Sequence, residues 1–164
     1  MHFPKKYLIV AVLAAVLLSF GSVFAGALPA KSEMSVSGSY FDPKGEGETV
    51  WVADGQIAMP IGEEGFVVFG PKLHLSSAED DAMGAVLEVN FLGTNHSGPF
   101  FGADGLYLQK EIPGLERYSV NGLAGLKIQV GPGGFIKVYA SAPIAGAGKD
   151  LTHITGNVGI GIRF

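Results

Sequence analysis

Apolar and polar residues alternate along most of the chain after residue 33. The alternation is clearest in the closing stretch, 154–164. Successive side chains of a β-strand point to opposite faces, so this pattern predicts a strand with one apolar face and one small or polar face. The apolar face holds Ile154, Val158, Ile160, Ile162 and Phe164, and the other holds Thr155, Asn157, Gly159, Gly161 and Arg163.

The same alternation recurs in seven earlier segments, which are separated by turn residues such as Gly, Pro, Asp and Asn. Most segments reach the roughly 9–11 residues that a tilted strand needs to cross a bilayer. An even number of strands lets both ends of an up-and-down barrel lie on one side of a membrane. We therefore expect an eight-stranded antiparallel barrel with strands at 34–42, 49–61, 66–76, 82–92, 99–110, 117–130, 135–144 and 154–164.

The fifth segment, 99–110, is the least regular. Leu106 and Leu108 favour the apolar face, yet Asp104 has the same parity. A β-bulge at Gly105 would change the register there and resolve this conflict, because it adds one residue to one strand. With that bulge, Asp104 would join the residues that point into the barrel.

Charged residues stand at mid-strand on the polar faces, among glycines and serines. The interior of an eight-stranded barrel is just wide enough for side chains to fill, so glycine and serine suit its narrow space. Buried charges must be paired, because an isolated one costs several kcal/mol. We therefore predict an inward-facing charge network that plugs the barrel, made of Asp54, Lys72, His74, Glu88, Lys127, Lys137 and Arg163.

Aromatic residues on the apolar faces gather near the strand ends. Two levels of aromatic side chains are typical of a membrane barrel, one at each lipid–water interface. An aromatic core in a soluble, lipocalin-like barrel is the alternative interpretation. The predicted interfacial residues are Tyr40, Trp51 and Tyr118 toward one barrel end, and Phe91, Phe164 and Phe100 toward the other.

The first 27 residues have the three parts of a secretory signal peptide. Lys5 and Lys6 precede an apolar run over 7–20, and the small residues at 25–27 form a cleavage site that competes with one at 23–25. The apolar run is shorter than the roughly 20 residues of a membrane-spanning helix. We expect residues 1–27 to be removed and 28–164 to form one barrel domain.

The amino-acid composition argues against several classes of function. The chain has 164 residues, 25 glycines, no cysteine and a formal charge of −4. Glycine at this level disfavours long helices, and the lack of cysteine excludes disulfides and thiolate chemistry. An acidic chain without a basic cluster is a poor nucleic-acid binder. No cofactor or metal site is expected, since four histidines are scattered along the chain.

The signal segment and a closing strand that ends on Phe164 resemble small eight-stranded outer-membrane β-barrel proteins, such as the OmpA-type membrane domain and OmpX-like proteins. The resemblance implies a Gram-negative outer membrane, with membrane lipids and lipopolysaccharide around the barrel. In that family the terminal aromatic residue belongs to the signal that the barrel-assembly machinery reads. Such barrels carry many functions, so the resemblance does not decide the activity.

Two stretches contain residue types that could carry chemistry. His74 and Ser76 are faintly similar to a His-x-Ser pair of lipid-A deacylases of the same barrel class. His74 lies on the inward face, however, and no carboxylate that would orient it is evident. The acidic loop 79–81 is either a solvated loop tip or a site for divalent cations. We predict no catalytic residue.

The leading functional expectation is a non-enzymatic outer-membrane protein, structural or surface-interacting, with a plugged interior. A small binding or transport barrel, porin-like or lipocalin-like, is the first alternative. A lipid-modifying outer-membrane enzyme is the second.

Overall fold

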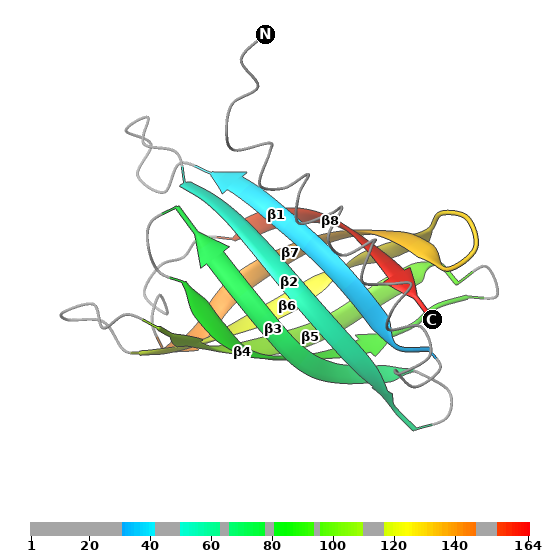
Figure 1. Cartoon of the computed structure of the whole chain (residues 1–164), viewed down its shortest axis with the longest axis horizontal. Helices are drawn as coiled ribbons and strands as arrows, with labels where there is room; N and C mark the ends of the chain where they lie inside the picture. Colours follow the sequence, from blue (N-terminus) through cyan, green and yellow to red (C-terminus); the bar gives the residue numbers. More distant parts are fainter. Residues whose placement is uncertain are drawn as a thin grey trace, which may run out of the picture.

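The computed structural model describes residues 31–41, 50–62, 66–77, 81–93, 96–109, 117–146 and 154–164. These residues form a closed antiparallel barrel in which each strand pairs with its neighbours in the chain and β1 pairs with β8 (Figure 1). The predicted all-β, eight-stranded class is confirmed, whereas residues 1–27 lie outside the described part. The strands are β1 (Glu33–Phe41), β2 (Val50–Ile61), β3 (Val67–Ser76), β4 (Ala82–Asn90), β5 (Gly98–Leu108), β6 (Tyr118–Gln129), β7 (Gly134–Gly146) and β8 (Thr155–Arg163).

The barrel has two distinct ends. At the turn end, β1, β3, β5 and β7 begin and β2, β4, β6 and β8 end (Figure 1). At the loop end, β2, β4, β6 and β8 begin and β1, β3, β5 and β7 end. An up-and-down topology with an even number of strands produces this arrangement, because the first and last strands then terminate together.

The predicted bulge at Gly105 is wrong. β5 runs in unbroken register against both neighbours, with Gly105 opposite Ala85 on β4 and Val120 on β6. Leu106 and Leu108 therefore point inward and pack with Ala82. Packing of the leucines in the interior replaces the lipid contact that would have required a register change.

The irregularity lies one hairpin later. The register of β6 against β7 shifts between Val120 and Asn121, which face Ala145 and Pro143 respectively. Proline has no backbone N–H to give to the ladder and is found mainly at bulges or strand edges. The bulge therefore coincides with the proline of β7.

The two faces of the sheet have opposite character. Large apolar side chains such as Leu126, Val138 and Val158 are exposed on the outer wall, while Glu88 and Lys127 in the interior are completely buried. A water-soluble barrel has the reverse distribution, since burial of apolar surface drives its folding. The exposed large apolar residues on the outer wall include Phe69, Leu73, Met83, Leu87, Phe101, Leu126, Ile128, Val138, Val158 and Ile160.

Close cross-strand contacts place aromatic rings over glycines inside the barrel. Phe135 is opposite Gly161, and a Cβ atom added to Gly161 would lie 2.4 Å from the Phe135 ring. Tyr139 is likewise opposite Gly125. The glycines thus leave the space that these rings occupy. This packing explains the small residues on the polar faces better than exposure to solvent does.

The prediction that Phe100 lies at the membrane interface is wrong. It is fully buried in the interior, where it packs with Val86, Leu123 and Tyr139. Phe100 and Asp104 are an even number of residues apart on the unbroken strand β5, so both side chains point to the same face, the interior. Phe100 is therefore not an interfacial residue.

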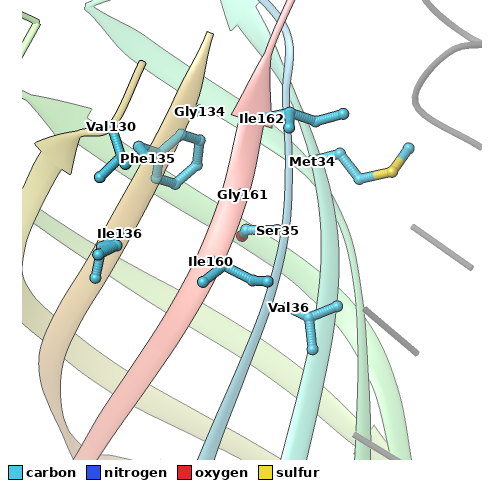
Figure 2. Close-up of a pocket in the computed structure, with 10 residues that line it drawn as sticks. All are labelled: Met34, Ser35, Val36, Val130, Gly134, Phe135, Ile136, Ile160, Gly161 and Ile162. Atoms are coloured by element: carbon cyan, nitrogen blue, oxygen red, sulfur yellow. The ribbon is translucent and has the colours of Figure 1, made fainter. Parts of the chain in front are cut away.

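The outer wall near the turn end carries an apolar hollow of about 320 Å³ (Figure 2). Ile160 and Ile162 of β8 and Ile136 of β7 contribute to its lining. No charged residue of the described part lines it, in keeping with the apolar outer wall elsewhere.

Candidate functional site

The barrel interior is the candidate site, because every strand contributes a charged side chain to it. Four acids face four bases there, so the network is formally neutral while His74 is uncharged. Opposite charges stabilise one another strongly where water is excluded. The acids are Glu33, Asp54, Glu88 and Asp104, and the bases are Lys72, Lys127, Lys137 and Arg163.

Five charged residues form a cluster nearer the turn end, which we call the turn-end cluster: Glu33, Glu88, Lys127, Lys137 and Arg163. Glu88 Oε2 lies 2.8 Å from Lys127 Nζ, and its other oxygen pairs with Lys137. Glu33 binds both Lys127 and Arg163, with Arg163 Nε donating at 3.0 Å. The cluster therefore links β1, β4, β6, β7 and β8 across the interior.

Neutral groups complete this cluster. Gln56 Nε2 donates to Glu88 Oε1 at 3.1 Å. The Lys137 ammonium lies 4.7 Å from the Phe100 ring centroid, and that of Lys127 lies 5.3 Å from the same ring. A lysine over an aromatic face gains cation–π attraction, which offsets part of the cost of losing water.

A second group, the loop-end cluster, consists of Asp54, Lys72, His74 and Asp104. Lys72 Nζ lies between the two carboxylates, 2.5 Å from Asp104 Oδ2 and 3.2 Å from Asp54 Oδ2. His74 Nδ1 is 2.7 Å from Asp54 Oδ1. Asn121 Nδ2 donates to Asp104 Oδ1 at 2.6 Å. Each carboxylate oxygen of this cluster thus has a partner.

Tyr139 connects the two clusters. Its hydroxyl donates to Asp54 at 3.2 Å and is 2.8 Å from the hydroxyl of Ser37. Its ring packs against Phe100 and lies 4.8 Å from the Lys137 ammonium. The interior is therefore one continuous polar network with aromatic side chains between its charges.

His74 requires a correction. The sequence showed no carboxylate to orient it, but Asp54 takes this position because the β2–β3 register places Asp54 directly opposite His74. Hairpin pairing was the signal that could have found it. Among the hydrogen bonds of the described residues, none joins His74 to a serine or threonine hydroxyl that could act as a nucleophile.

A polar cavity of about 160 Å³ lies at the loop end of the interior. The loop-end cluster forms part of its wall, so the cavity ends where the charged network begins. Hydroxyls and amides from several strands supply the rest of the lining, among them Ser39, Ser76, Asn121, Ser141, Thr155 and Asn157.

The predicted network residues therefore divide between two clusters, and sequence reasoning missed several of their partners. The alternation predicts a first strand that begins at residue 34, whereas β1 begins at Glu33, which shares the inward parity of Ser35 and Ser37. Tyr139 and Gln56 share the inward parity of Lys137 and Asp54, but parity alone assigns them no partner. Only the closed barrel brings these side chains together.

Apart from Phe100, the predicted interfacial aromatics lie on the outer wall. Tyr40 is opposite Trp51 near the loop end, and Tyr107 is opposite Tyr118. At the turn end Phe91 packs edge-on against Phe66 and Phe101, with ring centroids 4.9 and 6.1 Å apart. Phe164 is half-buried, and its backbone N–H donates to the carbonyl of Ser32 at 3.0 Å.

Comparison with known proteins finds no match to any protein family, curated protein or solved structure. Within the described residues, no helix is long and apolar enough to cross a membrane. In the same residues, no group of three or more His, Cys, Asp and Glu side chains could hold a metal ion.

Proposed function

We propose that this chain is an outer-membrane β-barrel protein with a plugged interior and a structural or surface-interacting role. The observation that carries the proposal is the inverted distribution of side chains. Lys127, Lys137 and Glu88 are fully buried inside, whereas Ile144, Val158 and many other apolar residues are exposed outside. Such an outer wall is stable in lipid, while in water it would expose far more contiguous apolar surface than a soluble monomer tolerates.

The aromatic side chains support a membrane orientation. Tyrosine and tryptophan lie near the loop end and phenylalanines near the turn end, with the apolar wall between them. Amphipathic aromatic rings favour the lipid–water interface. We place the loop end outside the cell and the turn end in the periplasm, since outer-membrane barrels have longer loops outside.

The interior favours a plug over a pore. The two clusters fill the barrel with paired side chains from opposite walls, and aromatic rings close the space between them. A lipocalin-like barrel would need an apolar interior for its ligand, which these charges do not offer. The proposed surroundings are membrane lipids and lipopolysaccharide, and the proposed assembly partner is the barrel-assembly machinery acting on Phe164.

Membrane fractionation of a Gram-negative host that expresses the full chain tests this proposal. We expect the protein in the outer membrane, with a folded form that migrates differently from the boiled form in detergent gels. In planar bilayers we expect no steady large conductance. Recovery as a soluble periplasmic protein would contradict the membrane assignment, and a steady open channel would contradict the plug.

A further inference from the structure

The closing seam between β1 and β8 is paired over only part of its length. Its ladder runs from Glu33↔Arg163 to Gly38↔Val158 and stops there within the described residues. Both strands continue beyond this point, to Phe41 in β1 and from Thr155 in β8. The same register would next place Ser39 opposite Asn157, but that pair is not formed.

The two strands remain in the sheet on their other sides. Ser39 is still opposite Val52 on β2. Asn157 is still opposite Tyr139, and Thr155 is opposite Ser141 on β7. The loss of pairing is therefore specific to the seam, and it begins at Ser39, next to the Tyr40–Trp51 pair.

The polar cavity borders the unpaired part of the seam. Ser39 from β1 and Thr155 and Asn157 from β8 all line it, so both edges of the seam border the same space. The hydroxyl of Ser39 is buried and has no hydrogen-bond partner. Buried hydroxyls are nearly always hydrogen-bonded, so this atom indicates a place for a polar group that enters the cavity.

The net charge of the residues that line the cavity indicates which kind of polar group would enter it. Two carboxylates, Asp54 and Asp104, stand against one ammonium, Lys72, which leaves one formal negative charge while His74 is neutral. A concave site with this balance attracts a cation and repels an anion. Below the separation, the outer wall offers the exposed side chains of Val158 and Ile160 to an alkyl chain.

We propose that the seam admits the primary-ammonium head of a single-chain amphiphile from the outer leaflet. The head occupies the polar cavity beside Ser39 and the loop-end cluster, and the alkyl chain stays in the lipid along Val158 and Ile160. This inference rests on the proposed function, because the seam opens into lipid only in a membrane-inserted barrel.

Trp51 provides the measurement, because it is the only tryptophan of the chain and is opposite Tyr40 beside the seam. The protein is held in uncharged micelles with trace dodecylamine brominated near its head, and Trp51 fluorescence is recorded. We expect the brominated amine to quench Trp51 and unbrominated dodecylamine to reverse this quenching. Dodecylamine should do so at a concentration about tenfold lower than dodecanol or dodecanoate, a factor that corresponds to about 1.4 kcal/mol. Equal competition by all three chains would show mere contact with the wall and overturn the proposal.

Two further measurements test the role of the alkyl chain and the role of the ammonium charge separately. Ethylamine that competes as well as dodecylamine would overturn lateral entry, because the ligand would then be a free amine. Thr155→Lys should weaken dodecylamine competition about tenfold more than Thr155→Gln does, because the two new side chains have similar length and only lysine is charged. Equal effects of the two substitutions would overturn the charge selection.

A disulfide across the seam tests the opening itself, since the chain has no cysteine of its own. Tyr40→Cys with Gly156→Cys joins the unpaired part of the seam, and Met34→Cys with Ile162→Cys bridges a paired position as the control. Oxidation should abolish dodecylamine-specific quenching only in the first pair. Unchanged quenching in a protein that remains folded and outer-membrane-inserted would overturn this inference alone, whereas failure to insert would overturn the proposed function as well.

Discussion

Glu88 Oε2 and Lys127 Nζ lie 2.8 Å apart in the barrel interior, and neither side chain is exposed. Glu88 also pairs with Lys137, so one carboxylate on β4 holds two ammonium groups, from β6 and β7. Removal of one member of a buried ion pair leaves an uncompensated charge, which costs more than loss of the attraction alone. Glu88 is therefore the residue whose loss should damage the interior most.

Glu88→Ala should lower the free energy of unfolding by about 3–5 kcal/mol, because Lys127 and Lys137 would lose their shared partner. Urea titration of the barrel in detergent measures this change through the unfolding midpoint. Leu87→Ala is the control at the neighbouring position, since Leu87 faces the outer wall. An unfolding midpoint of Glu88→Ala equal to that of the wild type would show that the network does not stabilise the barrel.

The glycines of β8 offer a second test. Gly161→Ala should destabilise the barrel by about 1–3 kcal/mol, the usual cost of overpacking, because its Cβ would lie 2.4 Å from the Phe135 ring. Gly156→Ala is the matched control on the same strand, where a Cβ meets nothing within 4 Å. Equal unfolding midpoints for the two variants would contradict the packing of Phe135 over Gly161.

Local alternation along the sequence predicts some features of this barrel, whereas others depend on contacts between distant strands. Period-two alternation alone places Asp54, Lys72, Glu88 and Lys127 on inward faces, because parity is a local property of a strand. The eight strands follow from the same rule together with turn residues. These features need no knowledge of which strands are neighbours.

Partners across the barrel could not be predicted in this way. The contact of Glu88 with Lys127 joins β4 to β6, and that of Glu33 with Lys127 joins β1 to β6, so both depend on closure and on strand stagger. The expected bulge at Gly105 failed for a related reason. It assumed that leucines must face lipid, whereas Leu106 and Leu108 find apolar contacts inside near the loop end.

The terminal residue tests the assembly proposal. Deletion of Phe164 should reduce the amount of inserted protein and increase its degradation in the periplasm, as the resemblance to outer-membrane barrels implies. Quantitative immunoblots of outer-membrane and periplasmic fractions measure both effects. Phe164→Tyr retains an aromatic end and should insert normally. Normal insertion of the truncated chain would count against recognition of Phe164.

The outer wall gives the test that best separates a membrane barrel from a soluble one. Leu126 and Val138 are opposite one another on β6 and β7, and both are exposed. In lipid, an arginine near the bilayer midplane of a barrel costs about 2–4 kcal/mol, and close to the interface only about 0–1 kcal/mol. In water, a substitution at either exposed position would change stability by less than about 0.5 kcal/mol.

Leu126→Arg should therefore destabilise the barrel in lipid bilayers by less than the roughly 2–4 kcal/mol of a midplane arginine, but by more than Ile154→Arg does. Ile154→Arg is the control, because Ile154 is exposed at the loop end, directly before β8 begins. Denaturant titrations in vesicles, followed by Trp51 fluorescence, give both free energies of unfolding. The sign of the difference is fixed by depth, since Leu126 lies within the paired wall and Ile154 lies beyond the end of β8. If Leu126→Arg and Ile154→Arg unfold at the same midpoint as the wild type, the outer wall does not face lipid.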